Sequence, residues 1–271
     1  MFKLQNIHTH TIYCDGTLPL EEMVKAAINK GCESLGFSGH SYAPFDSKNS
    51  MSPEITSRYI QEIKQLKKKY AGKIELYAGI EQEYLAEPVK VDLDYTIGSA
   101  HFINKGESLI CIDWSAESQK RECEENYGGN YYSMAEDYFA VVADIARKTD
   151  ADVIGHFDLI AKYNSGGHLF NEADPRYVST ALDAMDEILK NLNLFEVNTS
   201  AMYKFGKAEP YPSVLLLKEL HKRGGEVIIT SDSHDAESIC YKYDEMRELL
   251  KACGFKYMKQ LTKDGFIDVR L

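Results

Sequence analysis

Six of the eight histidines come at the ends of short apolar segments, a position from which several imidazoles can reach one site. They are His8, His10, His40, His101, His156 and His234. Three acidic residues stand within or beside the same segments: Asp15, Glu81 and Asp232. Imidazole and carboxylate ligands together suit Zn, Fe, Mn or Co, whereas an all-oxygen set favours Mg or Ca. The nine residues therefore predict a site for divalent metal ions, with more ligands than one ion needs.

The spacing of these residues supports shared ligation. His8 and His10 are two residues apart, so on an extended strand both imidazoles project from the same face, and Asp232 and His234 repeat this spacing. A single histidine on an apolar strand is more often a hydrogen-bonded core residue than a ligand. Six imidazoles and three carboxylates buried together without a cation would leave costly unpaired charges. We therefore expect the set to bind metal jointly.

The elements that must position these residues follow an alternating pattern. Short β-branched, apolar runs alternate with amphipathic stretches of helical period, which predicts parallel strands joined by crossover helices. The active sites of such folds lie at the carboxyl ends of the strands, where most of the nine residues stand. The predicted strands are Leu4–His10, Ser34–His40, Ile74–Tyr84, Tyr95–Phe102, Val153–Leu159, Leu194–Ser200 and Val227–His234.

Several boundaries are marked by local signals. Helices are expected to begin at Ser52–Pro53 and Asp174–Pro175, where a capping side chain precedes a proline, and to end before Gly31 and Gly224. Residues 103–130 are predicted to form a long loop with a helical piece that covers the site. Residues 257–271 are predicted to form a terminal strand or hairpin packed on the barrel. No repeat or linker is visible, so residues 1–271 are predicted to be one domain.

The composition narrows the class of protein. The chain has 271 residues, with 31 Lys and Arg against 42 Asp and Glu, a net charge of −11. This balance disfavours nucleic acid and anionic membranes as partners, since both need basic surfaces. The first residues lack the features of a secretory signal, and no apolar run could span a membrane, so a cytoplasmic location is expected. The six cysteines fall singly, which favours reduced thiols.

Three residues near these patterns are given no catalytic role. His168 lies in a glycine-rich loop, and His221 stands in a helical stretch before two basic residues. Neither follows a predicted strand. Cys14 stands beside Asp15, but the sequence identifies no basic partner that would form its thiolate, so we expect it to pack rather than to act as a nucleophile.

These motifs resemble the polymerase and histidinol phosphatase (PHP) domain family, and within it the monofunctional histidinol-phosphate phosphatases. The resemblance spans residues 7–234, in the order expected for the family. Each motif is modest by itself, but the ordered set is specific. The motifs are His8-Thr9-His10-Thr11-Ile12-Tyr13-Cys14-Asp15-Gly16, Ser38-Gly39-His40, Gly79-Ile80-Glu81, Gly98-Ser99-Ala100-His101-Phe102, Gly155-His156-Phe157-Asp158, Glu196-Val197-Asn198-Thr199-Ser200 and Ser231-Asp232-Ser233-His234.

The resemblance implies an α/β fold, a distorted (β/α)7 TIM-like barrel, with a site for three divalent metal ions (Zn, Fe or Mn). Asp15 stands where some relatives have histidine, a substitution that could tune which metal is accepted. By the family pattern, the first ion is held by His8, His10, Glu81 and Asp232. The second is held by Glu81, His101 and His156, so that Glu81 bridges two ions. The third is held by Asp15, His40 and His234.

The activity implied is hydrolysis of L-histidinol phosphate to L-histidinol and phosphate in histidine biosynthesis, by a metal-bridging hydroxide. The partner is then a small-molecule phosphate monoester. Such a hydroxide attacks phosphorus in line while the ions neutralise charge on the phosphoryl oxygens, so no covalent phospho-enzyme is required. We expect Asp232 to receive the proton of the nucleophile, and His234 to help orient the phosphate.

Four further residues are candidates for binding the substrate. Lys162 and Lys204 follow predicted strand ends, where related phosphatases have basic residues that grip phosphate. Many relatives have arginine at these places, which binds phosphate through two hydrogen bonds. The alternative is that Lys162 and Lys204 are ordinary surface lysines with no role in binding. Asn198 and Ser200 could donate hydrogen bonds to substrate, or could simply cap the end of a strand.

Other functions stay open at this point. Another phosphoesterase of the same family, either a protein-tyrosine phosphatase or an exonuclease, is the main alternative, although nucleic-acid processing predicts a basic groove. A noncatalytic interaction domain would be expected to keep a simpler, closed metal site. An acidic neighbourhood is expected for the substrate amine, with Asp158 and Glu83 as candidates. The sequence leaves the oligomeric state undetermined.

Overall fold

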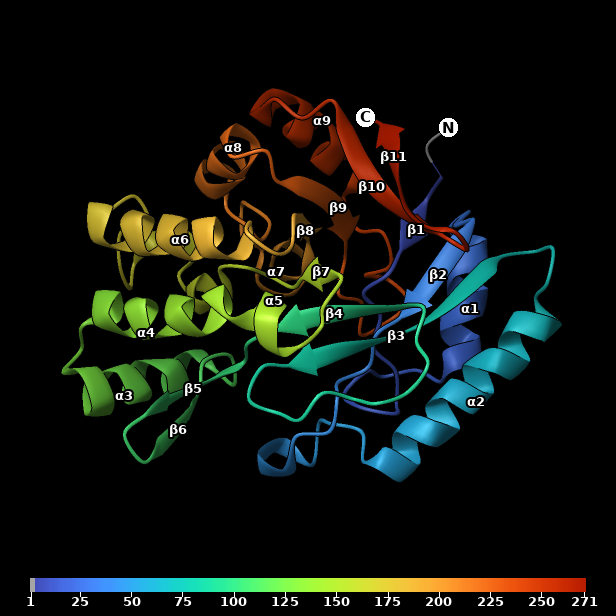
Figure 1. The fold of residues 1–271 in the computed structure, drawn as a ribbon, viewed down its shortest axis with the longest axis horizontal. Helices are drawn as coiled ribbons and strands as arrows, with labels where there is room; N and C mark the ends of the chain where they lie inside the picture. Colours follow the sequence, from blue (N-terminus) through green and yellow to red (C-terminus); the bar gives the residue numbers. More distant parts are fainter. Residues whose placement is uncertain (1–2) are drawn as a thin grey trace.

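A seven-stranded parallel sheet forms the centre of the computed structural model, which describes residues 3–271. Its strands follow one another in chain order, and the first and last are brought together by a parallel bridge between Thr9 and Ser233. The sheet is thus a nearly closed barrel (Figure 1), which confirms the predicted barrel fold. The strands are β1 (Gln5–Asn6), β2 (Ser34–Phe37), β3 (Glu75–Glu83), β4 (Tyr95–Ser99), β7 (Val153–Ile154), β8 (Leu194–Asn198) and β9 (Glu226–Thr230).

Helices surround this sheet on the outside (Figure 1). Among the described residues, none of them is both long enough and apolar enough to cross a membrane. The connections also include short 3-10 turns at Pro44–Asp46, Leu159–Ala161 and Ser165–Gly167. The helices are α1 (Leu20–Asn29), α2 (Pro53–Lys69), α3 (Ala116–Tyr127), α4 (Tyr131–Ala143), α5 (Ile145–Lys148), α6 (Pro175–Ile188), α7 (Ser200–Phe205), α8 (Val214–Lys222) and α9 (Tyr243–Cys253).

The predicted helix boundaries are confirmed. The Ser52 hydroxyl accepts a backbone N–H from the first turn of α2, and the Asp174 carboxylate does the same for α6. Each helix then starts with proline, which has no N–H to leave unpaired. Gly31 follows α1 with φ +79° and Gly224 follows α8 with φ +78°, the left-handed conformation that glycine adopts without steric cost.

All seven strands are shorter than predicted, and two of them by most of their length. The run Leu4–His10 pairs with β2 only over Gln5–Asn6, and the run Val153–Leu159 is a strand only over Val153–Ile154. Beyond Asn6 the backbone bonds to the segments after both β2 and β9, as Ser38 N–H donates to the Thr9 carbonyl at 3.0 Å and Ser233 N–H to the His8 carbonyl at 2.9 Å. Apolar patterning marks a segment as buried, and it does not say how far the ladder of hydrogen bonds extends.

The segment 103–130 is more ordered than the predicted loop. It contains most of a hairpin, β5 (Phe102–Lys105) with β6 (Ser108–Cys111), followed by α3. The turn of the hairpin has Gly106 at φ +60°, and two isoleucines, Ile103 and Ile110, bury one face of it. The prediction missed the hairpin because each strand is only four residues long and charged residues flank the turn.

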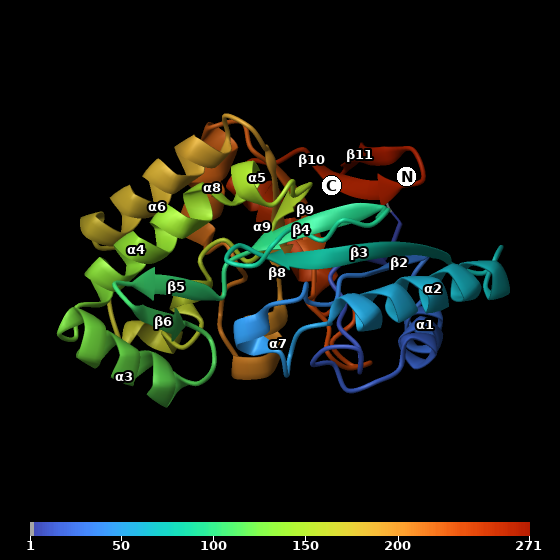
Figure 2. The ribbon, with the colours of Figure 1, turned by 60° about the horizontal axis from the view of Figure 1, so that its bottom comes forward.

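The two mouths of the barrel are covered differently. The predicted terminal hairpin is present as β10 (Tyr257–Thr262) and β11 (Gly265–Arg270), and it docks beside the start of β1, where Gln5 and Leu261 exchange two hydrogen bonds of 2.8 Å. Figure 2 places this hairpin on one side of the molecule, with β5, β6, α3 and α7 toward the opposite side. The carboxyl ends of the strands are thus left for a site.

The interior of the barrel is filled around Tyr95. Its buried hydroxyl donates to the backbone carbonyls of Ile7 and Phe37, and so ties three neighbouring parts of the sheet together. The ring lies against Gly79 of the adjacent strand, where an added Cβ would come within 2.4 Å of a ring carbon. Glycine is therefore required at this position by close packing.

We predict that Gly79→Ala lowers the free energy of unfolding by about 1–3 kcal/mol, because overpacking forces the ring or the strand to move. Chemical denaturation followed by circular dichroism measures this change. Ser57→Ala on the exposed face of α2 is the control, with an expected change within about 0.5 kcal/mol. Equal stability of Gly79→Ala and the wild type would show that the barrel interior is less tightly packed than described.

Candidate metal centre

The structure brings all nine predicted residues together at the carboxyl ends of the strands. Each comes from a strand end or the loop after it, so the rigid sheet determines their relative positions. After β1 come His8, His10 and Asp15; after β2, His40; within β3, Glu81; after β4, His101; after β7, His156; and after β9, Asp232 and His234.

Glu81 lies at the middle of this group, with its side chain almost completely buried. Its Oε2 atom is 3.1 Å from His40 Nδ1 and 3.3 Å from the Nε2 atoms of both His8 and His10. Its Oε1 atom is 2.9 Å from His156 Nε2 and 3.4 Å from His101 Nε2. One carboxylate therefore faces five imidazoles, as expected of a group that bridges ions.

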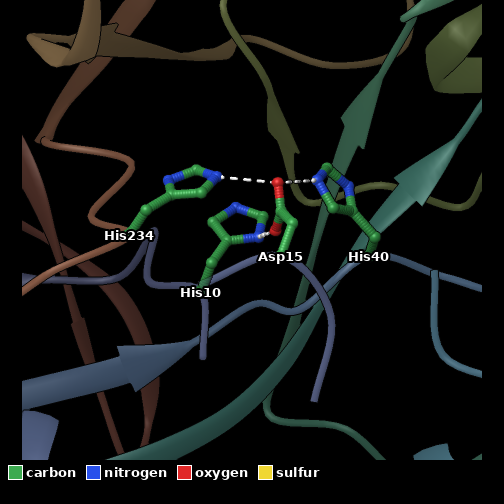
Figure 3. A group of neighbouring side chains, drawn as sticks. All are labelled: His10, Asp15, His40 and His234. Atoms are coloured by element: carbon green, nitrogen blue, oxygen red, sulfur yellow. Dashed lines mark hydrogen bonds and ion pairs between the residues drawn. The ribbon is translucent and has the colours of Figure 1, made fainter. Parts of the chain in front are cut away.

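Asp15 is the centre of a second, more exposed group (Figure 3). Its oxygens lie 3.0 Å from His234 Nε2, 3.2 Å from His10 Nδ1 and 3.5 Å from His40 Nε2. These four residues can each direct one ligand atom to a common point, and so can two other sets. The other sets are His8, His10 and Asp232, and His40, Glu81 and His101.

The charges of the group favour bound cations. Burial alone raises the pKa of Glu81, but the imidazoles of His8, His40 and His101 lower it well below its usual value. In the same way burial lowers the pKa of His101, but Glu81 and other carboxylates raise it to about 10. Both shifts have one cause, the mutual attraction of buried carboxylates and protonated imidazoles, and bound metal ions would supply the same positive charge to the carboxylates.

The donor atoms are also free to bind a metal. Within residues 3–271, His8 Nε2 and His10 Nε2, which face the cluster carboxylates, are buried with no hydrogen-bond partner. A buried polar nitrogen without a partner is costly, and ligation of a cation removes the cost. Oxygen and imidazole ligands in this arrangement fit a divalent transition metal.

Glu196 on β8 also belongs to this site, although the sequence analysis assigned it no role. It contacts His8 on the side of the ring that faces away from Glu81. It is fully buried and accepts hydrogen bonds from His8 Nδ1 at 2.7 Å, Thr230 Oγ1 at 2.8 Å and Asn198 Nδ2 at 2.8 Å. Because His8 Nδ1 then carries the proton, its Nε2 is left as the ligand atom. A charged residue inside an apolar strand was the signal that could have identified it.

Glu83 has a similar place beside His101. Its Oε2 atom is 2.9 Å from His101 Nδ1 and also accepts the backbone N–H of His101. Glu83 was expected as a partner for a substrate amine, but this carboxylate already has an imidazole partner. Asp158, the other residue expected there, is fully buried and accepts the backbone N–H of Ser213.

Asp232 is held in an unusual backbone conformation, with φ +45°. Non-glycine residues adopt it only where their surroundings impose it. Here hydrogen bonds on both sides impose it, from Ser231 N–H to Asn6 Oδ1 and from Ser233 N–H to the His8 carbonyl. The conformation directs the Asp232 carboxylate to within 3.2 Å of His10 Nε2.

A cavity of about 80 Å³ opens from the cluster. Lys162, Lys204 and Ser200 line it, as expected of groups that contact substrate. Lys162 Nζ also lies 3.0 Å from Asp113 Oδ2, a partner not foreseen from the sequence.

Asn198 is not among the lining residues. It is buried, and its side chain bonds Glu196 and the Ser200 N–H. Its contacts match the strand-end cap rather than a substrate group.

The three residues without an assigned role lie as follows. His168 is exposed, with Nδ1 2.7 Å from the Ser165 carbonyl, and the His221 ring packs against Phe255. Cys14 is within the site after all, because its Sγ lies 3.5 Å from His10 Nδ1. The sequence did not reveal this basic neighbour, because the two side chains meet only when the turn after β1 folds Cys14 back toward His10.

Comparison with known proteins agrees with this geometry. The family model described as PHP domain matches residues 6–200. The chain belongs to the PHP domain family. A probable histidinol-phosphatase of Deinococcus radiodurans is 30% identical to this PHP protein over 266 residues, which are 94% of this chain and 95% of the relative.

Two solved structures share the fold of this PHP protein. The putative histidinol phosphatase of Listeria monocytogenes has a TM-score of 0.75 with 22% identity, over 89% of this chain and 99% of that one. The histidinol phosphate phosphatase of Lactococcus lactis has a TM-score of 0.70 with 19% identity, over 98% and 99%. That Lactococcus protein was crystallised with zinc, L-histidinol and phosphate.

We predict that Glu196→Gln weakens metal binding by about tenfold to a hundredfold, because the amide cannot fix the His8 tautomer as a carboxylate does. Competition with a coloured chelator, followed by metal analysis, measures the affinity. Glu187→Gln, on the exposed side of α6, is the control and should retain wild-type affinity. Wild-type metal affinity in Glu196→Gln would show that Glu196 has no role in metal binding.

Proposed function

We propose that this PHP protein is a metal-dependent phosphatase that hydrolyses L-histidinol phosphate to L-histidinol and phosphate. The observation that carries the proposal is the Glu81-centred cluster, which opens directly into a cavity lined by two lysines. The names of its relatives support the choice of substrate. A noncatalytic domain would have no use for ligands that open to a cavity, because structural metal sites are closed.

The nine residues would hold three divalent ions, Zn, Fe or Mn, in the sets expected for the family. Asp15, His40 and His234 would hold one of them, around the Asp15 carboxylate. When bound, such ions lower the pKa of water and neutralise charge that develops on phosphoryl oxygens. Glu196 orients His8 and Glu83 orients His101, each through the Nδ1 atom of the imidazole.

The lysines and Ser200 bind the phosphoryl group. Lys204 at the end of α7 and Lys162 beside Asp113 bring two positive charges to the wall of the cavity. The Ser200 hydroxyl lies on the same wall and can donate a hydrogen bond. Together these groups orient the ester so that its phosphorus faces the cluster, and they make an acidic protein attractive to an anion.

Asp232 is the residue that takes the proton of the attacking water. Burial raises the pKa of its carboxyl, but His8 and His234 lower it well below the usual value, so Asp232 is ionised before reaction. It lines the cavity, and its strained backbone fixes its direction. His234 lies 3.4 Å from Asp232 Oδ1 and helps to orient the phosphate. We expect the protein to act in the cytoplasm and on small molecules.

The proposal is tested by comparing kcat/KM for four substrates: L-histidinol phosphate, an aryl phosphate, a phosphotyrosine peptide and a short oligonucleotide. We expect L-histidinol phosphate to be hydrolysed with the highest kcat/KM. A clear preference for the peptide would instead indicate a protein-tyrosine phosphatase, and a preference for the oligonucleotide an exonuclease.

Loss of a ligand should separate catalysis from folding. We predict that His101→Ala releases metal and lowers kcat/KM at least a hundredfold, while its unfolding temperature in the metal-free state stays near that of the metal-free wild type. Metal analysis, steady-state kinetics and calorimetry check the three parts. His168→Ala, an exposed histidine outside the cluster, is the control. Full metal content and activity in His101→Ala would refute the role of His101.

Removal of the metal ions should also abolish activity. We expect prolonged dialysis against a chelator to abolish hydrolysis, and added Mn or Zn to restore it, because the residues of the cavity have no other means to lower the pKa of water. The same kinetic assay follows both steps. Activity that survives with no detectable metal would contradict the proposed chemistry.

A further inference from the structure

A second cavity, of about 180 Å³, lies directly beside the first. It opens between the loop after β2, the start of β5 and the segment that follows β6. The two cavities have several wall residues in common, so a molecule in one can extend into the other. The shared residues are Asp15, His40, His101, Asp113 and Lys162.

One wall of this second cavity is aromatic. Phe102 is held edge-on against Phe45, with their ring centroids 5.0 Å apart. Trp114, the only tryptophan of the chain, also lines the cavity and is 65% exposed. An indole this exposed at the mouth of a cavity gains contact area when a flat ring lies against it.

Four carboxylates line the same cavity, and three of them have a basic partner. Glu83 is bonded to His101, Asp113 to Lys162, and Asp15 to the imidazoles of the cluster. Asp46 differs. In the part of the chain that the structure describes, its carboxylate accepts a side-chain hydrogen bond from Asn49 at 2.9 Å, and it forms no ion pair.

The surroundings of Asp46 favour a cationic ligand. It is only partly exposed, and its burial raises the pKa of its carboxyl, a sign that water stabilises its charge incompletely. His40 and His101 oppose that shift, and Asp113 adds to it. A cation placed beside Asp46 would supply the charge compensation that the protein does not provide.

The substrate of the proposed function has the groups to fill this space. In L-histidinol phosphate the amine is on the carbon next to the ester CH2, and the imidazole follows one carbon further. With its phosphate at the metal centre, both groups must lie within a few bonds of the first cavity. The adjoining space is the second cavity, which offers a carboxylate and an aromatic wall.

We propose that the second cavity is the specificity pocket of the enzyme, in which Asp46 pairs with the substrate ammonium and Trp114 covers the imidazole. The inference rests on the proposed function for the identity of the substrate. It assigns selectivity to two residues outside the metal centre. Asp113 remains paired with Lys162, so it holds that lysine at the boundary between the two cavities.

The pocket is tested with four phosphate monoesters that separate the two groups. L-Histidinol phosphate has the amine and the ring, O-phosphoethanolamine has the amine alone, 3-(imidazol-4-yl)propyl phosphate has the ring alone, and propyl phosphate has neither. The wild type, Asp46→Asn and Trp114→Ala are assayed for kcat/KM with each ester. The matched controls are Asp264→Asn and Tyr257→Ala, exposed residues of the β10–β11 hairpin.

Asp46→Asn should reduce the preference for amine-bearing over amine-free esters by about tenfold to a hundredfold, the range expected from loss of a charge-assisted hydrogen bond. Trp114→Ala should reduce the preference for ring-bearing over ring-free esters by about threefold to tenfold. Both control variants should keep the wild-type preferences. Equal losses on all four esters, or unchanged preferences in both variants, would overturn the inference.

Failure of the inference and failure of the proposed function give different results. If the wild type hydrolyses L-histidinol phosphate well and Asp46→Asn keeps its preference for amines, the function stands and the pocket is wrongly assigned. If the wild type shows no preference for L-histidinol phosphate over propyl phosphate, the proposed function falls, and the specificity pocket falls with it.

Discussion

The site depends on the burial of a single carboxylate, Glu81, among five imidazoles. A buried carboxylate is stable only with compensating charge, and here that charge must come from protons on histidine or from bound cations. The imidazoles arrive from the ends of four different strands, so the compensation exists only when the barrel is closed. Folding and assembly of the metal centre are therefore coupled.

Several features of the barrel serve this arrangement. The bridge between Thr9 and Ser233 joins the first strand to the last, and it places the ligands after β1 beside those after β9. Glu196 is behind the cluster and orients His8, while Glu83 orients His101. Carboxylate partners of this kind fix the tautomer of each imidazole, so the nitrogen that faces Glu81 is the one left free to ligate a cation.

The exposed side of the site is built by less regular parts of the chain. Lys204 is carried by the short helix α7, and Lys162 follows a 3-10 turn and is held by Asp113 from the segment after β6. Loops of this kind vary more easily than strands, which explains how one metal centre can serve different phosphate esters within a fold. Selectivity and chemistry are thus assigned to different parts of the molecule.

Much of this could be predicted from the sequence, because charged residues inside apolar runs are rare and their spacing is informative. The order of the strands and the convergence of residues such as His101 and His156 followed from that pattern. The partners of Glu196 and Lys162 could not be predicted, since they depend on contacts between segments tens of residues apart. The β5–β6 hairpin was not predicted, because its strands are too short to show a clear alternation of apolar and polar residues.

Binding of a group of divalent metal ions by the side chains around Glu81 and Asp15 is the property on which the proposed function depends. Anomalous diffraction, recorded from crystals above and below the absorption edges of zinc, iron and manganese, tests it most directly. We expect three anomalous peaks, each within ligand distance of some of the nine predicted ligands. No peaks in metal-supplemented, active crystals, or peaks only at surface carboxylates, would contradict it.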